Sequence, residues 1–320
     1  MSSLTLGVDV GGTKVLGIVL RDGVVVDSHR VATPHDDQRP AGDATTEAVY
    51  AVINELRARH DHDDLVVGVG LPGMMSREGV LAFAPNLPTA SGADVATALA
   101  AYDPQLRVLC ENDADCAAVA EHRLGAGRGY DDMIMITLGT GIGGGIISQG
   151  ELLRGRSGFA GEVGHMVVDA AGPRCPCGSR GCWERFASGG GVGRLAREAA
   201  SAGRLPLLVA QCGDAESVRG EDVTRAAAAG VEEAIAVMDE VGWWLALGLA
   251  NLTAILDTGH FVIGGGLSEA SQLLLPSAQR HLESLVEGSS ARPPITVVKS
   301  QFGEISGAIG AALLARERLG

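Results

Sequence analysis

The chain has 320 residues, of which 46% are hydrophobic and 20% charged, and its formal net charge is −14. This composition is typical of a globular protein, and the length fits two domains of ordinary size. The acidic balance argues against nucleic acid as a partner, because phosphate contacts need a basic face. The first residues lack the basic start and long apolar run of a signal peptide. The most apolar stretch, 241–256, is too short to span a bilayer. We therefore expect a cytoplasmic protein with a buried helix at 241–256 and no membrane partner.

A glycine turn lies between two predicted strands at the N-terminus, 4–10 and 15–20. This hairpin is neither a dinucleotide fingerprint nor a Walker loop, since both need a helix after the glycines. Gly11 and Gly12 allow backbone amides to approach an anion, Thr13 adds a hydroxyl donor, and Lys14 adds a compact ammonium. Asp9, at the end of the first strand, is placed to hold Mg²⁺ directly or through water. An ordinary hairpin is the alternative for this motif alone.

A second copy of this pattern is predicted at 133–147, where a strand at 133–138, a glycine turn at 139–145 and a return strand from 146 follow one another. Thr140, Gly141 and Gly143 are its candidate phosphate-binding residues. Two such turns indicate two related lobes that clamp a polyphosphate. A third run, Gly264–Gly266, follows a strand at 261–263 and precedes a helix from about residue 268. Its backbone is a candidate surface for a nucleotide base or ribose, and a plain strand-to-helix turn is the alternative.

Carboxylates follow a predicted strand at 106–110 and precede a predicted helix at 116–124. Side chains at the carboxyl end of a parallel strand lie where α/β sheets place their chemistry. Asp113 is the preferred general base over Glu111 and Asp115, because it sits at the turn itself. A helix cap by Asn112 or Asp113 is an alternative that is compatible with catalysis. Upstream, we expect a helix at 45–59, a buried strand at 65–71, and a loop at 83–88 in which Asn86 meets a hydroxylated ligand.

His165, Cys175, Cys177 and Cys182 form a compact donor set of one imidazole and three thiols. This is a complete tetrahedral set for zinc with no position left for water, as in a structural site. A disulfide or free thiols are the alternatives. Adjacent thiols in Cys-x-Cys are poorly placed to bridge each other, and nothing marks the chain as secreted.

Two carboxylates flank this donor set, Glu162 and Glu184. A metal that fixes His165 also fixes where these carboxylates point, and the imidazole can present its second nitrogen to a ligand. Such a group suits a ligand covered in hydroxyls, so Glu162, His165 and Glu184 are candidate sugar-binding residues. Solvated carboxylates, or pairs with Arg180 and Arg185, are the alternative. The remaining segments, 189–200, 223–229, 231–252 and 305–318, are predicted helices, with a short strand at 295–298.

Together these motifs resemble the ROK family of sugar kinases and repressors, within the actin–hexokinase–acetate kinase fold. The similarity is carried by Asp9–Lys14, Glu111-Asn112-Asp113, Leu138–Gly145, Gly161–His165 and Cys175–Glu184. Within the family the chain is most similar to bacterial ATP-dependent glucokinases, particularly actinobacterial ones, through Gly181–Glu184 and Ala187–Gly189. It differs from many relatives at Thr89–Gly92, where they carry an aromatic residue, and at Asp257-Thr258, where they have Asp-Pro.

The resemblance implies an α/β, two-lobed, hexokinase-like (ribonuclease H-like) fold. We expect a small lobe of residues 1–110, closed by a C-terminal helix at 303–320, and a large lobe of residues 111–302 with the zinc site. It also implies phosphorylation of glucose at the 6-hydroxyl by ATP with Mg²⁺, with Asp113 as base and Asn112, Glu162, His165 and Glu184 holding the sugar. Zinc is expected to be structural, and the assembly to be a homodimer or homotetramer.

Two other functions remain open from the sequence. A kinase for an N-acylhexosamine (N-acetylglucosamine or N-acetylmannosamine) or another hexose would share every motif above. A non-catalytic sugar-sensing protein would need neither Asp113 nor Lys14, and the family's repressors carry an N-terminal DNA-binding domain for which this chain shows no sequence.

Overall fold

A computed structural model describes residues 4–34, 43–60, 66–84, 87 and 90–320. The chain forms two compact units. Unit 1 consists of Met1–Asp131, Gly145–Gly161 and Glu304–Gly320, and unit 2 of Asp132–Gly144 and Glu162–Gly303. Unit 1 thus takes in residues beyond 110 that the sequence placed in the large lobe, and the predicted lobe boundary stays a prediction.

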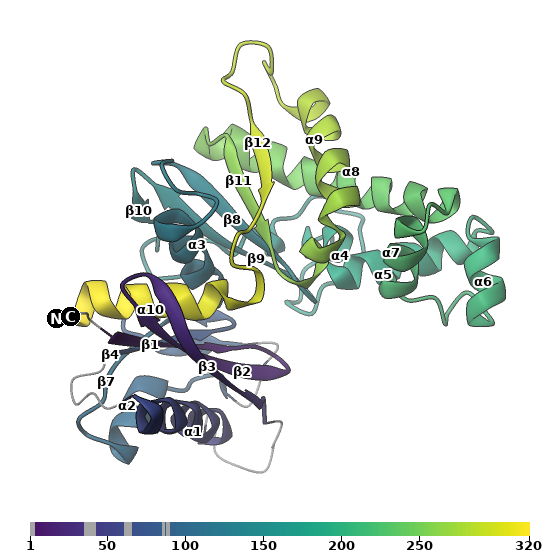
Figure 1. Cartoon of the computed structure of the whole chain (residues 1–320). Helices are drawn as coiled ribbons and strands as arrows, with labels where there is room; N and C mark the ends of the chain where they lie inside the picture. Colours follow the sequence, from purple (N-terminus) through teal and green to yellow (C-terminus); the bar gives the residue numbers. More distant parts are fainter. Residues whose placement is uncertain (1–3, 35–42, 61–65, 85–86, 88–89) are drawn as a thin grey trace. The chain divides into compact units, whose positions relative to one another are not determined.

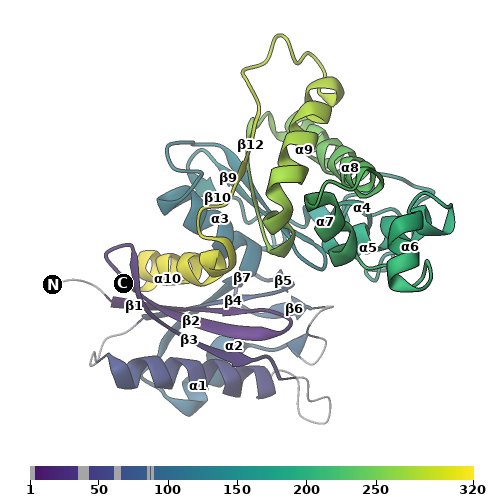
Figure 2. The same ribbon diagram turned by 45° about the vertical axis from the view of Figure 1, so that its right-hand side comes forward.

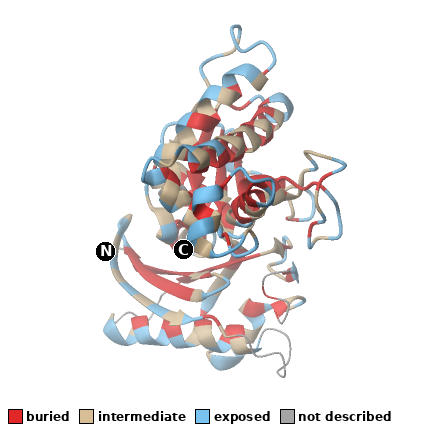
Figure 3. Cartoon of the chain, turned by 90° about the vertical axis from the view of Figure 1, so that its right-hand side faces the viewer, coloured by how far each residue is buried: buried red, intermediate tan, exposed pale blue. Residues whose placement is uncertain are grey.

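The first sheet has five strands in the order β3-β2-β1-β4-β7. Its strands are β1 (Leu4–Val10), β2 (Lys14–Arg21), β3 (Val24–Ala32), β4 (Val66–Leu71) and β7 (Arg107–Asn112). β1 and β2 form the predicted hairpin, with Val10 opposite Val15, whereas β1, β4 and β7 run parallel. β4 is buried along its whole length, and the interior strands of this sheet are red in Figure 3.

Helices cover both faces of the first sheet (Figures 1 and 2). α10 (Ser306–Leu319) lies on one face, and α1 (Asp43–Arg59) and α2 (Val95–Tyr102) lie on the other. Two glycines in the sheet allow α10 to approach closely. A Cβ on Gly7 would lie 1.9 Å from the carbonyl oxygen of Ala308, and a Cβ on Gly68 would lie 1.9 Å from the carbonyl oxygen of Ala311. α3 (Asp113–Leu124) packs against α10, where Gly310 meets the backbone of Cys116. The C-terminal helix α10 therefore packs both on the first sheet and on α3, the helix that directly follows β7.

The second sheet has the order β10-β9-β8-β11-β12. Its strands are β8 (Met133–Leu138), β9 (Ile142–Ser148), β10 (Glu151–Leu152), β11 (His260–Gly264) and β12 (Thr296–Lys299), and β8, β11 and β12 run parallel. A small hairpin pairs β5 (Met74–Met75) with β6 (Leu81–Phe83). The remaining helices are α4 (Glu184–Ala187), α5 (Gly189–Ser201), α6 (Pro206–Cys212), α7 (Gly220–Ala228), α8 (Glu232–Leu256) and α9 (Ser271–Leu285), with short 3₁₀ turns η2 (Val163–His165), η3 (Gly266–Ala270) and η4 (Gly303–Ile305).

Several predicted boundaries were wrong, including those of two of the glycine runs and of α3. β9 begins at Ile142 rather than at residue 146, so Gly143 lies within a strand and the turn is confined to 139–141. Glycine fits both strand and turn, and the sequence could not tell where pairing resumes. α3 begins at Asp113 rather than at residue 116, because the side chain of Asn112 caps it. After the third glycine run, η3 comes first and α9 begins only at Ser271.

α8 is the long apolar helix that contains the predicted buried stretch. Its most apolar 18-residue window has a mean hydropathy of 1.2, which by length and composition alone would suit a membrane span, but 56% of that window is buried inside the protein. It packs along α9, where Ser277 Oγ donates to Asp239 Oδ1 at 2.5 Å. This is the environment of a core helix, as the sequence predicted.

Candidate active site

Asp113 lies at the first turn of α3, directly after β7. Asn112 holds this turn, because its Oδ1 accepts from the amides of Ala114 (2.9 Å) and Asp115 (3.0 Å) and its Nδ2 donates to the Gly73 carbonyl oxygen (2.9 Å). Asp113 Oδ1 accepts from the Ala114 amide at 2.8 Å. The alternative of a cap at Asn112 is therefore confirmed, and the cap fixes the backbone that carries the candidate base.

Asp9 lies close to Asp113 within unit 1. A Cβ built on Gly70 would be 3.5 Å from both the Asp113 Cα and Asp9 Oδ1, and one on Gly307 would be 2.6 Å from Asp9 Oδ1. Two glycines thus leave the space in which the Asp9 carboxylate sits. Burial raises the pKa of Asp9 to about 7, although the nearby Lys14 ammonium lowers it. A second cation beside this carboxylate would favour its ionised form, so the site has the character expected of a Mg²⁺ position.

The first glycine turn is held by a hydrogen bond within the turn and by Thr33, which the sequence did not indicate. Gly11 N–H donates to the Lys14 carbonyl oxygen at 2.8 Å, and Thr33 Oγ1 donates to the Gly11 carbonyl oxygen at 2.6 Å. The Gly11 amide is therefore engaged inside the turn. Gly12 and Thr13 are exposed at its tip, so they are the better placed of the three to meet a phosphate.

Lys14 pairs with Glu304, which comes from the other end of the chain and also binds Arg30 at 2.7 Å. These two cations lower the pKa of Glu304, chiefly through the hydrogen bond from Lys14. The Glu304 side chain is 59% exposed, and exposed ion pairs contribute only about 0–1 kcal/mol. An incoming phosphate can therefore replace Glu304 as the partner of Lys14 at low cost.

In unit 2, the second glycine turn lies against Glu184 and the start of α5. Ser188 Oγ donates to the Thr140 carbonyl oxygen at 2.9 Å, and the Gly189 amide donates to that of Gly139 at 2.8 Å. A Cβ on Gly141 would lie 2.4 Å from Glu184 Oε2. A predicted nucleotide residue and a predicted sugar residue are thus neighbours.

The third glycine run lies beside the second turn, because β8 and β11 are parallel neighbours with Gly264 opposite Thr137. Gly265 has a φ of +82°, and a Cβ there would lie 2.5 Å from the Leu138 carbonyl oxygen. A side chain would therefore separate the two loops. Gly266 is exposed, and a Cβ there would meet no atom of the described residues within 4 Å, so its backbone is a candidate surface for a flat ligand.

The predicted metal ligands come together in unit 2. The donor atoms of His165, Cys175, Cys177 and Cys182 all lie within 4.8 Å of one another. The distance from Cys175 Sγ to His165 Nδ1 is 3.8 Å, and that from Cys177 Sγ to Cys182 Sγ is 3.6 Å. Tetrahedral zinc with Zn–S bonds of about 2.3 Å gives ligand–ligand edges of about 3.8 Å. All three cysteines are free thiols, so the donor set fits zinc and the disulfide alternative is wrong.

The three thiols of this cluster differ in pKa: burial raises the pKa of Cys175 and of Cys182, whereas that of Cys177 is lowered. Burial alone would raise the pKa of the Cys177 thiol, but the Ser179 amide and the neighbouring thiols lower it to about 7. A thiolate is the form that binds zinc.

The predicted sugar residues of unit 2 surround the same histidine. His165 Nε2 lies 3.9 Å from Glu162 Oε2, and His165 Nδ1 lies 4.0 Å from Glu184 Oε1. Glu184 Oε1 also accepts from Cys175 Sγ at 3.0 Å. Burial raises the pKa of Glu162, while His165 opposes the shift. Nδ1 faces the thiols, which leaves Nε2 and two carboxylates as acceptors and donors for hydroxyl groups.

The structure therefore assembles the predicted residues in two groups, one in each unit. Unit 1 holds Asp9, the 11–14 turn and Asn112-Asp113; unit 2 holds both later glycine runs, the Cys/His cluster and its two carboxylates. Asn86 lies outside the described residues. The sequence missed Thr33 and Glu304, each of which contacts a predicted residue over a long separation and carries no local signal of its own. Ser188 entered only as part of the Ala187–Gly189 resemblance, without a role.

Carboxylates beside a hydroxyl-binding group and glycine turns that can receive an anion are the parts needed for phosphoryl transfer to a sugar. The ROK family model matches residues 5–318 of this chain. A glucokinase of Streptomyces coelicolor is 36% identical over 98% of both chains, and an N-acetylmannosamine kinase of Citrobacter koseri is 32% identical over 98% of both. The crystal structure of a ROK family glucokinase from Streptomyces griseus, in complex with glucose and AMPPNP, is 36% identical and covers 98% of this chain and 100% of its own, with a TM-score of 0.86. This chain belongs to the ROK family and has its two-lobed α/β kinase fold.

Proposed function

We propose that this protein is a glucokinase that transfers the γ-phosphoryl group of ATP to the 6-hydroxyl of glucose, giving glucose 6-phosphate and ADP. The observation that carries the proposal is the carboxylate of Asp113 at a capped helix start, beside Asp9 and in the same unit as the glycine turn that bears Lys14. This is the arrangement that in-line phosphoryl transfer requires of its base and of its anion-binding groups.

In the proposed mechanism, Asp113 accepts the proton of the sugar hydroxyl as its oxygen attacks the γ-phosphorus, and ADP leaves with the bridging oxygen. Such a base contributes about 10²–10⁴ in rate. Lys14 and the backbone amides near Gly12 and Thr140 hold the phosphates in line, which supplies much of the remaining acceleration. Asp9 would hold Mg²⁺, which supplies neutralisation of phosphate charge when it is bound with ATP.

The sugar is proposed to be held by Asn86, Asn112, Glu162, His165 and Glu184. Zinc on the four ligands His165, Cys175, Cys177 and Cys182 has no role in bond making in this proposal. It would fix the imidazole so that Nε2 faces the sugar, as metal-bound histidines present their second nitrogen. The base of ATP is proposed to lie along Gly264–Gly266, and its phosphates near Gly141, Gly143 and the 11–14 turn.

Glucose is preferred over an N-acylhexosamine because the identity to the glucokinase is 36% and that to the N-acetylmannosamine kinase is 32% over equal coverage. A non-catalytic sugar sensor is disfavoured, because it would have no use for an aspartate at the capped turn or for Lys14. Cytoplasmic location and a homodimer or homotetramer accompany the proposal as predictions.

ATP consumption measured with glucose, mannose, N-acetylglucosamine and N-acetylmannosamine tests the proposal directly. We expect the highest kcat/KM with glucose. Preference for an N-acyl sugar would select the second candidate, and no sugar-dependent turnover with any of them would remove the kinase assignment.

Asp113→Ala should reduce kcat by ~10²–10⁴ while glucose still binds, measured by the coupled assay and by calorimetry. Asp94→Ala is the matched control, because Asp94 also lies at a helix start in unit 1, where its Oδ1 accepts from the Thr97 amide at 2.9 Å. The control loses a helix cap and some stability but should keep its turnover. Near-normal kcat in Asp113→Ala would contradict the assignment of the base.

A further inference from the structure

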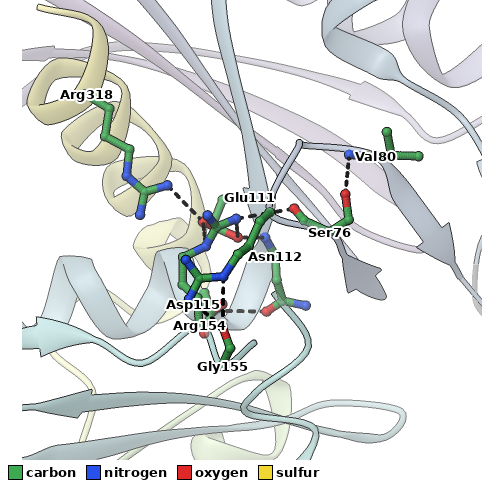
Figure 4. Close-up of polar contacts among 9 residues, drawn as sticks. Ser76, Val80, Glu111, Asn112, Asp115, Arg154, Gly155 and Arg318 are labelled. Atoms are coloured by element: carbon green, nitrogen blue, oxygen red, sulfur yellow. Dashed lines mark hydrogen bonds and ion pairs between the residues drawn. The ribbon is translucent and has the colours of Figure 1, made fainter. Parts of the chain in front are cut away.

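The carboxylate of Glu111 is the centre of a buried ionic cluster in unit 1 (Figure 4). The residue is 1% exposed. Arg154 Nη2 donates to Oε1 at 3.2 Å, and Arg154 Nε lies 2.9 Å from Oε2 as an ion pair without hydrogen-bond geometry. Arg318 Nη1 lies 3.3 Å from Oε2. The backbone amide of Asn112 donates to Oε1 at 3.2 Å. One carboxylate thus receives two guanidinium groups and the amide of the residue that caps α3.

Each arginine ties this carboxylate to a different part of the chain. Arg154 follows β10, and its Nη2 also lies 3.3 Å from the Ser76 carbonyl oxygen, after β5. The same two segments are joined a second time, because Arg77 Nε donates to the Gly155 carbonyl oxygen at 2.9 Å. Arg318 comes from the last turn of α10. Three segments that are distant in sequence therefore meet at the residue just before Asn112-Asp113.

Stability alone explains this cluster poorly. Taking charges out of water is costly, and replacing a buried ion pair by apolar residues of similar volume is often neutral or stabilising. The location is what distinguishes Glu111. Burial and the carboxylates of Glu111, Asp115, Asp9 and Asp113 raise the pKa of the Cys116 thiol well above its usual value, so four acidic groups act on one sulfur atom. Two arginines on Glu111 offset the repulsion that it would otherwise exert on its acidic neighbours.

We propose that Glu111, held by Arg154 and Arg318, is a positioning residue that fixes the Asn112 cap and, through it, Asp113 for phosphoryl transfer. The proposal rests on the function proposed above. Arg154 meets both carboxylate oxygens, Oε1 by a hydrogen bond and Oε2 as an ion pair, and this charge-assisted contact restricts where the carboxylate lies. The fixed Oε1 then holds the Asn112 amide, and Asn112 sets the first turn of α3. A displacement of about 1 Å at a reacting group can reduce the rate about 10²-fold.

The test compares Glu111→Gln, Arg318→Gln and the control Asp103→Asn in the full-length protein. Asp103 is matched because its carboxylate also pairs with an arginine in unit 1, Arg57, at 2.6 Å. For Glu111→Gln we expect kcat to fall about 10–100-fold, with the KM values for glucose and ATP changed less than about threefold. Arg318→Gln should show a smaller fall, because the Arg154 contacts with Glu111 remain. Asp103→Asn should keep the wild-type kcat even if its melting temperature falls.

Two further measurements separate positioning from general destabilisation. In an Asp113→Ala background, Glu111→Gln should give no additional loss of residual turnover. Amide hydrogen exchange of the peptide covering 111–116 should accelerate in Glu111→Gln, and this readout does not depend on the reaction. If Glu111→Gln does not fold, the same two measurements on Arg318→Gln, turnover in the Asp113→Ala background and hydrogen exchange at 111–116, test the proposal.

A folded variant with wild-type kcat and unchanged exchange at 111–116 would overturn the proposal. So would a loss of turnover that is equally large without Asp113. Failure of the glucokinase assignment is a different result: the wild type itself would not phosphorylate glucose, while the exchange experiment would still report on the Glu111 anchor.

Discussion

Gly248→Ala tests whether the packing of Trp183 against α8 supports the candidate metal cluster. Gly248 lies in α8, and a Cβ there would be 2.0, 2.3 and 2.4 Å from three carbons of the Trp183 indole. Non-bonded carbons prefer about 3.5–4.0 Å, so the indole would have to move by roughly 1.5 Å. Trp183 is fully buried, and its Nε1–H donates to the Trp244 carbonyl oxygen at 2.7 Å. It has little room to move.

The magnitude follows from two opposing terms. Alanine in place of glycine in a helix contributes about 1 kcal/mol, whereas overpacking a dense core costs about 1–3 kcal/mol or more. We expect a net loss of ~1–2 kcal/mol, and each kcal/mol lowers the melting temperature by roughly 2–4 °C in a unit of this size. Cys182 and Glu184 flank Trp183 in sequence, so the displacement should also lower zinc retention and glucose affinity.

Thermal unfolding, zinc content and glucose binding measure these effects. Gly193→Ala is the control, because Gly193 lies inside α5 and its added Cβ would be 3.5 Å or more from its neighbours. The control should be as stable as the wild type or more so, by up to ~1 kcal/mol. Equal stability of the two variants would refute the view that the Trp183 indole packs too tightly against α8 to admit a Cβ at position 248.

Three other predictions follow from the same structure. Cys177→Ser should release zinc, measured by atomic absorption, and lower the melting temperature and glucose affinity together, because His165 loses its fixed orientation. Asp9→Asn should stabilise the Mg²⁺-free protein at pH 8 but not at pH 4, by about 4 kcal/mol at most, since the folded pKa of about 7 lies some 3 units above 3.8 and each unit is worth 1.36 kcal/mol. Gly7→Ala should destabilise unit 1 in urea unfolding by about 1–3 kcal/mol or prevent folding, because its Cβ would lie 1.9 Å from the Ala308 carbonyl oxygen.

The sign of the Asp9 prediction comes from linkage. A carboxyl group whose folded pKa is raised contributes stability below its unfolded pKa, and that contribution is lost as the pH rises through the folded value. The side chain is only partly buried, so the observed difference should fall below the stated limit. A pH-independent difference between wild type and variant would contradict the raised pKa. For Cys177→Ser, zinc loss with unchanged glucose affinity would remove the positioning role of the metal.

The parts of the fold and site that depend on local spacing could be predicted from the sequence. Both glycine hairpins were found, since alternation of apolar residues and a glycine turn are short-range signals. The strand β7 and the helix α3 were found for the same reason, apart from the last residues of β7 and the first of α3, and the predicted cap by Asn112 or Asp113 is made by Asn112. The boundary of β9 was missed because Gly143–Gly145 fit strand and turn equally well.

The four candidate metal ligands lie within 165–182, so their types and spacing alone predicted the donor set, and the structure brings their donor atoms within 4.8 Å of one another. Only the tertiary structure decided which cation meets which carboxylate. Lys14 and Glu304 are 290 residues apart, and Glu111 and Arg318 are 207 apart. Such pairs depend on the order of strands in the sheet and on the glycines that admit α10. No local pattern encodes them, because a side-chain charge can pair with any opposite charge that packing brings within reach.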